Sequence, residues 1–79
     1  MKFTLISPTG SQVLEINWLE VETATGNFVI QPGHAPLIAP LAPNKEIQLS
    51  LEDGSTTIMT LAGGILEVNR DDITLLAYS

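Results

Sequence analysis

The sequence predicts one all-β domain over residues 1–79, a flattened β-sandwich of short, mainly antiparallel strands. Three observations favour this class. Apolar residues recur with a period of two rather than 3.6. Five prolines leave no intact amphipathic helix. Two turn signals in the second half of the chain fit β-hairpins. A flattened barrel of the same strands is the alternative arrangement.

Three strands are expected in the first half of the chain, within residues 2–5, 13–22 and 28–30. The alternation changes phase within the second of these. Ile16 and Trp18 occupy one phase, whereas Leu19 and Val21 occupy the other. In a regular strand such a change moves side chains to the opposite face, so we expect a bulge or bend near residues 17–19.

Two hairpins are expected in the second half. Asp53-Gly54 is a two-residue turn signal, because a type I′ turn needs positive φ at both central positions. That loop predicts Leu49 opposite Ile58 and Leu51 opposite Thr56. A two-residue loop at residues 70–71 predicts three cross-strand pairs with matched polarity: Val68 with Ile73, Glu67 with Thr74, and Leu66 with Leu75.

Composition and charge exclude several classes of function. Nine acidic residues against three basic ones give a net charge of −6, so the chain could not neutralise the phosphates of a nucleic acid or of an anionic lipid surface. No apolar run approaches the length of a membrane span, so we expect no direct membrane insertion. We expect a soluble cytoplasmic domain, monomeric and of modest stability when isolated.

The sequence contains no pattern typical of catalysis, of a cofactor or of a metal site. It has no cysteine, and its only histidine, His34, has no serine, cysteine or carboxylate beside it. A structural role in a turn is therefore favoured over a general base. The acidic pairs at 52–53 and 71–72 lack the spacing of a calcium loop and fit solvated turns. Gly63-Gly64 lacks a phosphate-loop lysine and indicates a bulge or a close backbone approach.

Two ordered blocks of sequence resemble a known family. Residues 26–37, Gly-Asn-Phe-Val-Ile-Gln-Pro-Gly-His-Ala-Pro-Leu, are similar to the signature segment G-E-F-G-I-L-P-G-H-A-P-L of ATP synthase epsilon subunits. Residues 63–68, Gly-Gly-Ile-Leu-Glu-Val, resemble the family's G-G-x-L-E-V, and residues 73–77 follow at the spacing of its V-T-V-L-A. Residues 3–8 also fit the first strand of the family. The resemblance spans nearly the whole chain.

The chain also departs from the family pattern. The segment between Val21 and Gly26 is shorter than in the family, and Asn27 replaces a frequent acidic residue in a loop that faces the c-ring in family members. Family members continue into an α-helical hairpin at the position of Ser79. The hairpin's restraint of ATP hydrolysis and its ATP binding are therefore not carried over. We expect the sandwich without the helical domain, as either a natural short form or a truncated one.

The resemblance implies a non-catalytic subunit of the central stalk, or rotor, of an F-type ATP synthase. Such a subunit docks on the gamma subunit and the c-ring at the cytoplasmic face of the membrane, and couples ion-driven rotation to ATP synthesis. The predicted partner-binding residues are Asn27, Phe28, Ile30, Pro32, Gly33, His34, Pro36, Leu37 and Ile38. The alternative for each of them is core packing beneath a turn. The run 38–43 is expected to be too rich in proline for a normal strand and, if exposed, to be a partner surface.

Two other classes of function stay open. A free-standing binding or regulatory module, unrelated to the rotor, would have a closed apolar pocket with converging polar groups. A hydrolase built on His34 would need an acid or a nucleophile brought beside it by the fold.

Overall fold

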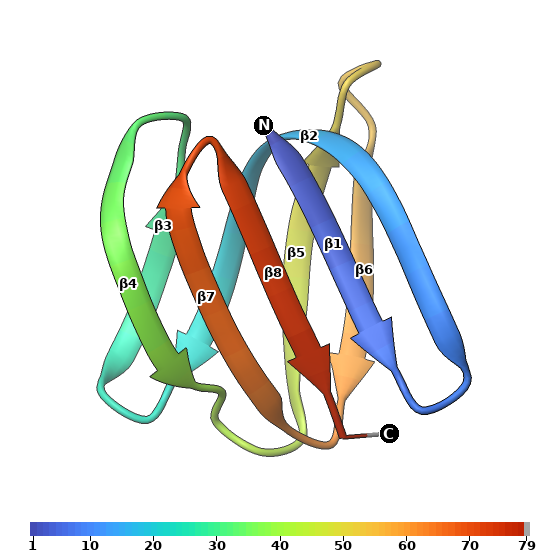
Figure 1. Ribbon diagram of the computed structural model, residues 1–79, viewed down its shortest axis with the longest axis vertical. Helices are drawn as coiled ribbons and strands as arrows, with labels where there is room; N and C mark the ends of the chain where they lie inside the picture. Colours follow the sequence, from blue (N-terminus) through green and yellow to red (C-terminus); the bar gives the residue numbers. More distant parts are fainter. Residues whose placement is uncertain (79) are drawn as a thin grey trace.

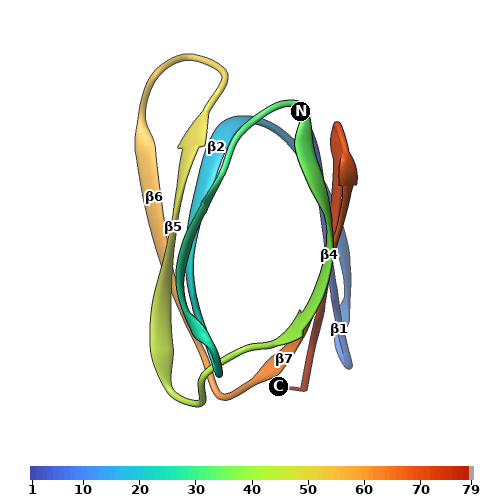
Figure 2. The same cartoon turned by 90° about the vertical axis from the view of Figure 1, so that its left-hand side faces the viewer.

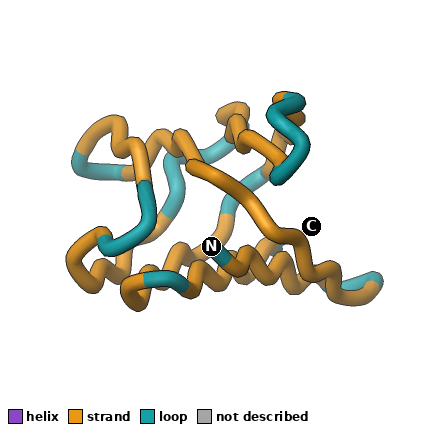
Figure 3. The backbone as a smooth tube through the Cα atoms, turned by 90° about the horizontal axis from the view of Figure 1, so that it is seen from above, coloured by secondary structure: helices purple, strands orange, loops and turns teal. Residues whose placement is uncertain are grey.

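The computed structural model describes residues 1–78, and within them the chain forms strands and turns without a helix, as predicted. The strands are β1 (Lys2–Ser7), β2 (Gly10–Thr23), β3 (Gly26–Ile30), β4 (His34–Pro40), β5 (Lys45–Leu51), β6 (Thr56–Leu61), β7 (Gly64–Arg70) and β8 (Asp72–Ala77). Figure 3 shows them joined by short loops. The all-β class is confirmed.

The strands form two layers that face each other (Figures 1 and 2). The first sheet has the order β4-β7-β8-β1 and continues into the first half of β2. The second sheet contains β3, the second half of β2, β5 and β6. Every pairing between these strands is antiparallel except that of β1 with β8. The predicted sandwich of mainly antiparallel strands is confirmed.

Strand β2 belongs to both sheets because it bends at a β-bulge. Ile16 pairs with Leu51 and Trp18 pairs with Ser50, which leaves Asn17 as the extra residue. The Asn17 side-chain amide donates to the Leu51 carbonyl oxygen at 2.9 Å and to the Ser50 hydroxyl at 3.3 Å. A bulge bends its strand and increases the local twist. The predicted phase change is confirmed. Because Leu19 after the bulge points into the core, the preceding Trp18 side chain points outward.

The core lies between the two sheets and is built from their inward-facing residues. Leu19 and Val21 follow the bulge and are buried, as is Ile16 before it. The buried cluster takes residues from both layers: Phe3, Ile16, Leu19, Val21, Ile30, Leu41, Ile47, Leu49, Leu66, Val68, Ile73, Leu75 and Ala77. This one core holds the two sheets at a fixed separation, because interiors of this kind are closely packed.

The β7–β8 hairpin has the predicted register. Val68 pairs with Ile73, Glu67 with Thr74, and Leu66 with Leu75. Arg70 takes a positive φ of 50° at the turn. The apolar pairs point into the core, and Glu67 and Thr74 lie on the outer face.

The predicted register of the β5–β6 hairpin is wrong by one residue. Leu49 pairs with Thr57, and Ile58 lies opposite Gln48. The loop has three residues, because Gly54 alone has a positive φ (92°) and its amide donates to the Leu51 carbonyl at 2.9 Å. A type I turn followed by a left-handed glycine closes such a loop, whereas type I′ needs two residues of positive φ.

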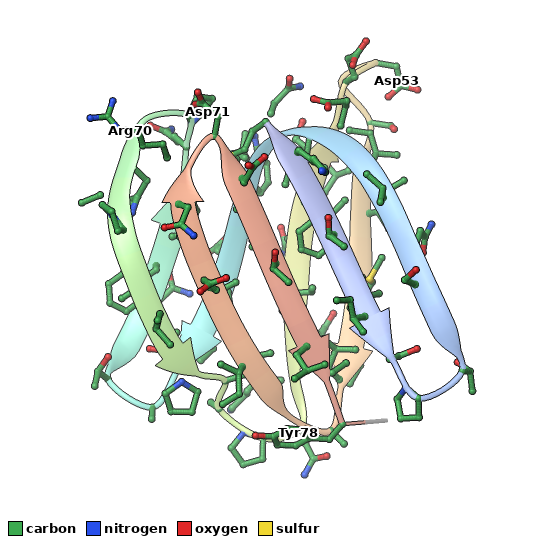
Figure 4. The ribbon with its side chains drawn as sticks, viewed as in Figure 1. Asp53, Arg70, Asp71 and Tyr78 are labelled. Carbon is green, nitrogen blue, oxygen red and sulfur yellow. The ribbon has the colours of Figure 1, made fainter. Side chains whose placement is uncertain are left out.

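Asp53 stabilises this three-residue loop through its side chain. Its carboxylate accepts hydrogen bonds from the Ser55 hydroxyl at 2.6 Å and from the Ser55 amide at 2.9 Å. The hydroxyl bond, followed by the amide bond, lowers the pKa of the Asp53 carboxyl below its ordinary value. Figure 4 shows Asp53 at the tip of the hairpin, which projects beyond the body of the sandwich.

The expectation that residues 38–43 are too rich in proline for a strand is wrong for their first part. Strand β4 continues to Pro40, and only β7 lies beside it in the sheet. Proline is tolerated on an edge strand because the missing N–H faces solvent. The register also shifts between His34 and Leu37, which accommodates Pro36 in a bulge.

The close backbone approach predicted at Gly63-Gly64 occurs at Gly64. A Cβ atom at this position would lie 2.5 Å from the Leu76 carbonyl oxygen and 3.3 Å from the Ala77 Cα. At Gly63 it would meet only the ring of Tyr78, at 3.3 Å, and that side chain is exposed and free to move.

We predict that Gly64→Ala destabilises the domain by about 2 kcal/mol or more, because two backbone segments must separate. Gly63→Ala is the matched control and should cost less than about 1 kcal/mol. Urea unfolding monitored by Trp18 fluorescence measures both changes. Equal stability losses in the two variants would contradict the close-approach account of Gly64.

Candidate functional site

The signature segment crosses from one sheet to the other. Strand β3 lies in the second sheet and β4 at the edge of the first, and the turn between them passes over one end of the sandwich (Figures 1 and 2). That end also holds the turn at Arg70 and Asp71 (Figure 4). Asn27 is the second residue of β3 and lies at the opposite end of the molecule, so the predicted residues do not form one continuous patch.

The turn at residues 31–34 has the geometry of a type II turn. The His34 amide donates to the Gln31 carbonyl oxygen at 3.0 Å, and Gly33 has a φ of 82°. Type II turns favour proline at the second position, where φ is already near the required value, and glycine at the third, where φ is positive. Pro32 and Gly33 therefore fix the shape of an exposed turn from the sequence itself.

His34 makes a local hydrogen bond. Its Nδ1 lies 2.7 Å from the carbonyl oxygen of Ala35, so the ring donates from this nitrogen. This bond orients the ring at the start of β4, which fits the structural role expected from the sequence. Within residues 1–78, no group of three or more histidine or acidic side chains is placed to hold a metal ion.

The predicted partner-binding residues divide into supports and accessible groups. Ile30 has no exposed surface, so it can act only as a support within the core. Phe28 and Leu37 are half-buried and pack against the same core. The exposed members are Asn27, Pro32, Gly33, Pro36 and Ile38. Ile38 stands out because 70% of its surface is exposed on the outer face of the first sheet.

The surroundings of Ile38 were not predicted from the sequence. Four strands place an apolar patch on the outer face of the first sheet: Ile6, Ile38, Ile65 and Leu76. With Glu67 and Thr74 these side chains line an open, shallow depression of about 280 Å³. Adjacent apolar residues at 65–66 and 75–76 were the available signal, because such pairs place an apolar residue on both faces of a strand.

The outer face of the second sheet has a different chemistry. Leu19, Val21 and Ile47 point inward, so Glu20, Glu22 and Glu46 lie in the outward-facing phase. Asn27 donates from its side chain to Glu22 at 3.3 Å. The outer face of the first sheet thus has an apolar patch around Ile38, whereas that of the second sheet combines three glutamates with the exposed Val29 and Ile58.

A second hollow lies beneath the β1–β2 turn and is lined mainly by polar residues and backbone, from Leu5 to Gln12. Like the depression on the first sheet, it is open rather than a closed pocket. No helix in residues 1–78 is long and apolar enough to cross a membrane.

Comparison with known proteins identifies the family. The family model of the ATP synthase delta/epsilon chain β-sandwich domain matches residues 1–79. This chain belongs to that family. The ATP synthase epsilon chain of Paracoccus denitrificans is 36% identical over 78 residues, covering 98% of this chain and 52% of the relative. The epsilon chain of Bacillus subtilis is 33% identical over 80 residues, covering all of this chain and 59% of the relative.

Solved structures share the fold of this epsilon-type sandwich. A chain of the Euglena gracilis mitochondrial ATP synthase matches 98% of it with a TM-score of 0.86 at 18% identity, over 49% of that chain. A chain of the Tetrahymena thermophila mitochondrial ATP synthase, from a structure of its central stalk and c-ring, matches all of it with a TM-score of 0.84 at 15% identity, over 63% of that chain. The sandwich spans roughly half of the length of the relatives that it matches.

We predict that Gly33→Ala destabilises the sandwich by about 1–2 kcal/mol, because alanine is strained at this positive φ. No atom lies within 4 Å of the added Cβ, so the backbone strain is the only expected cause. Gly33→Asn is the matched control and should lose less, since asparagine tolerates this conformation. A urea midpoint in Gly33→Ala equal to that of the parent would contradict the type II assignment.

Proposed function

We propose that this epsilon-type sandwich is a non-catalytic part of the central stalk of an F-type ATP synthase. It docks on the gamma subunit and on the c-ring, and it transmits ion-driven rotation toward the catalytic head. The observation that carries the proposal is the family match along residues 1–79, together with the order of the two motif blocks. The epsilon-chain names of the relatives support it.

The geometry supports a part that connects two partners. The turn at residues 31–34 and the loop before Asn27 lie at opposite ends of the sandwich (Figure 1). A closely packed core between them resists deformation, so a force applied at one end reaches the other with little loss. A turn already fixed by Pro32 and Gly33 loses little conformational entropy on docking.

The apolar patch fits the gamma subunit as a lateral contact. Covering Ile6, Ile38, Ile65 and Leu76 removes apolar surface from water and contributes favourably to association. Glu67 is exposed within the same area, and a buried carboxylate without a partner is costly. The docking surface of gamma must therefore offer a basic or hydrogen-bonding group to Glu67.

The loop before Asn27, at the end of the sandwich opposite the turn at residues 31–34, fits the c-ring. This assignment places the sandwich as a peripheral subunit at the cytoplasmic face of the membrane, held there by its protein partners. Asn27 provides an uncharged contact where relatives often have an acidic one, so the contact with the c-ring relies less on charge.

Co-expression with the gamma subunit of the same organism, followed by size-exclusion chromatography, tests the proposal. We predict that the two proteins co-elute at equal stoichiometry. Ile38→Lys should weaken the affinity for gamma at least tenfold, because a lysine in the patch would have to be desolvated in the complex. Ile58→Lys changes an equally apolar side chain on the opposite sheet and serves as the matched control. Ile30 is unsuitable for this test, since its replacement would damage the core.

Clean separation of the two folded proteins at micromolar concentration would overturn the docking on gamma and favour the free-standing module. Equal weakening by Ile38→Lys and Ile58→Lys would retain the partner but reject the apolar patch as its contact.

A further inference from the structure

The edge formed by β6 lacks the features that normally protect an exposed strand. Among the strands of residues 1–78, β6 pairs only with β5, in regular register from Thr56 to Leu61. Its sequence, Thr-Thr-Ile-Met-Thr-Leu, contains no charge, no proline and no glycine. Strand β4, at the edge of the other sheet, has two prolines and a bulge. Charges, prolines and bulges are the usual means of preventing strand addition, and β6 has none of them.

The side chains of β6 leave apolar surface accessible on both sides of this edge. Ile58 points outward and is 54% exposed, whereas Met59 and Leu61 pack only partly against the core. A six-residue strand with free backbone groups and partly exposed apolar side chains is a template for an added strand.

The edge also has electrostatic polarity. At the Thr56 end lies the hairpin tip with Glu52 and Asp53, both exposed. At the Leu61 end lie Lys45, which pairs with Leu61 across the hairpin, and Glu46, which pairs with Thr60, and both are exposed. An antiparallel neighbour of the same sequence would therefore bring its acidic tip beside Lys45, and its own lysine beside the acidic tip of the first chain.

We propose that β6 is a self-association edge, on which a second copy of this chain adds its own β6 in antiparallel orientation. A two-fold axis through the strand pair places Ile58 opposite Ile58 of the second copy and keeps the inward and outward faces of the two sheets continuous. The pairing satisfies free backbone groups, covers two isoleucines and brings the acidic tip of each copy toward Lys45 of the other copy rather than toward the second acidic tip.

The two outer faces suit a second copy less well. Stacking the second sheets would oppose the carboxylates of Glu20, Glu22 and Glu46, with like charges across the contact. Stacking the apolar patches would bury Glu67 against isoleucines and leucine without a counter-charge. In the edge dimer the second sheets lie side by side rather than stacked, so the carboxylates of Glu20, Glu22 and Glu46 do not oppose one another across the contact.

A single pair of six-residue strands buries less than the roughly 1,200–2,000 Å² of a stable interface. We therefore expect a weak dimer, with a dissociation constant on the order of 100 µM. At low micromolar concentration the chain is then a monomer, as expected from the sequence.

Sedimentation equilibrium of the isolated chain, from about 10 µM to about 1 mM, tests the proposal. The apparent mass is expected to rise from the monomer value of 8.5 kDa toward twice that value. Ile58→Lys should keep the chain monomeric over the whole range. Val13→Lys, at an equally exposed position on β2, is the matched control and should dimerise like the parent. Circular dichroism and urea unfolding establish that each variant is folded.

The charge polarity has its own variants. Lys45→Glu should weaken the dimer several-fold, and adding Glu52→Lys to it should restore association, because unlike charges meet again at both ends. A monomer at about 1 mM would overturn the proposal. So would a dimer that tolerates Ile58→Lys and is lost in Ile38→Lys, since that result assigns self-association to the apolar patch.

Discussion

The bend of β2 at Asn17 is the constraint on which the rest of the sandwich depends. One strand of 14 residues pairs with β1 in the first sheet and with β3 and β5 in the second. Because the extra residue sits at the bend, Ile16 before it and Leu19 after it both point into the same core. Asn17 also satisfies the Leu51 carbonyl, which keeps the disturbed ladder hydrogen-bonded. Both layers can thus share one interior in a chain of only 79 residues.

The distribution of residues outside the core decides what the sandwich can do. One outer face is apolar around Ile38, and the other carries three glutamates beside Val29 and Ile58. The two ends present a fixed turn and the loop before Asn27. None of these features resembles a pocket for a small molecule. A rigid body with chemically distinct sides can hold protein partners in fixed relative positions, which is what the proposed place in the central stalk would require.

Much of this fold was predictable from local patterns, and the errors have identifiable causes. Matched polarity on both sides of residues 70–71 gave the correct register of β7 and β8, because this pairing sets apolar residues opposite apolar ones and Glu67 opposite Thr74. The Asp53-Gly54 signal gave the wrong register, since the Ser55 hydrogen bonds and a single left-handed glycine favour a three-residue loop. The length of the strand containing Pro36 and Pro40 was underestimated. Proline is tolerated on an edge strand, and the segment alone does not show that its strand lies at the edge of a sheet.

The candidate site was less predictable than the fold. The motif marked the turn at residues 31–34, whose geometry follows directly from Pro32 and Gly33. It also marked Ile30, which is buried, since a motif does not separate residues that support a surface from residues that form it. The apolar patch joins residues from four strands far apart in the sequence, so it could be recognised only once the strand order was known.

Deletion of Asn17 tests the central role of the bend most directly. Removing the extra residue straightens β2, so β2 can no longer pair with β1 and β5 around one core. We therefore predict that the deletion variant shows no cooperative urea transition. Asn17→Ala keeps the residue count and should lose only about 1 kcal/mol, the value of the side-chain hydrogen bonds. A deletion variant that unfolds cooperatively near the midpoint of the parent would contradict this account.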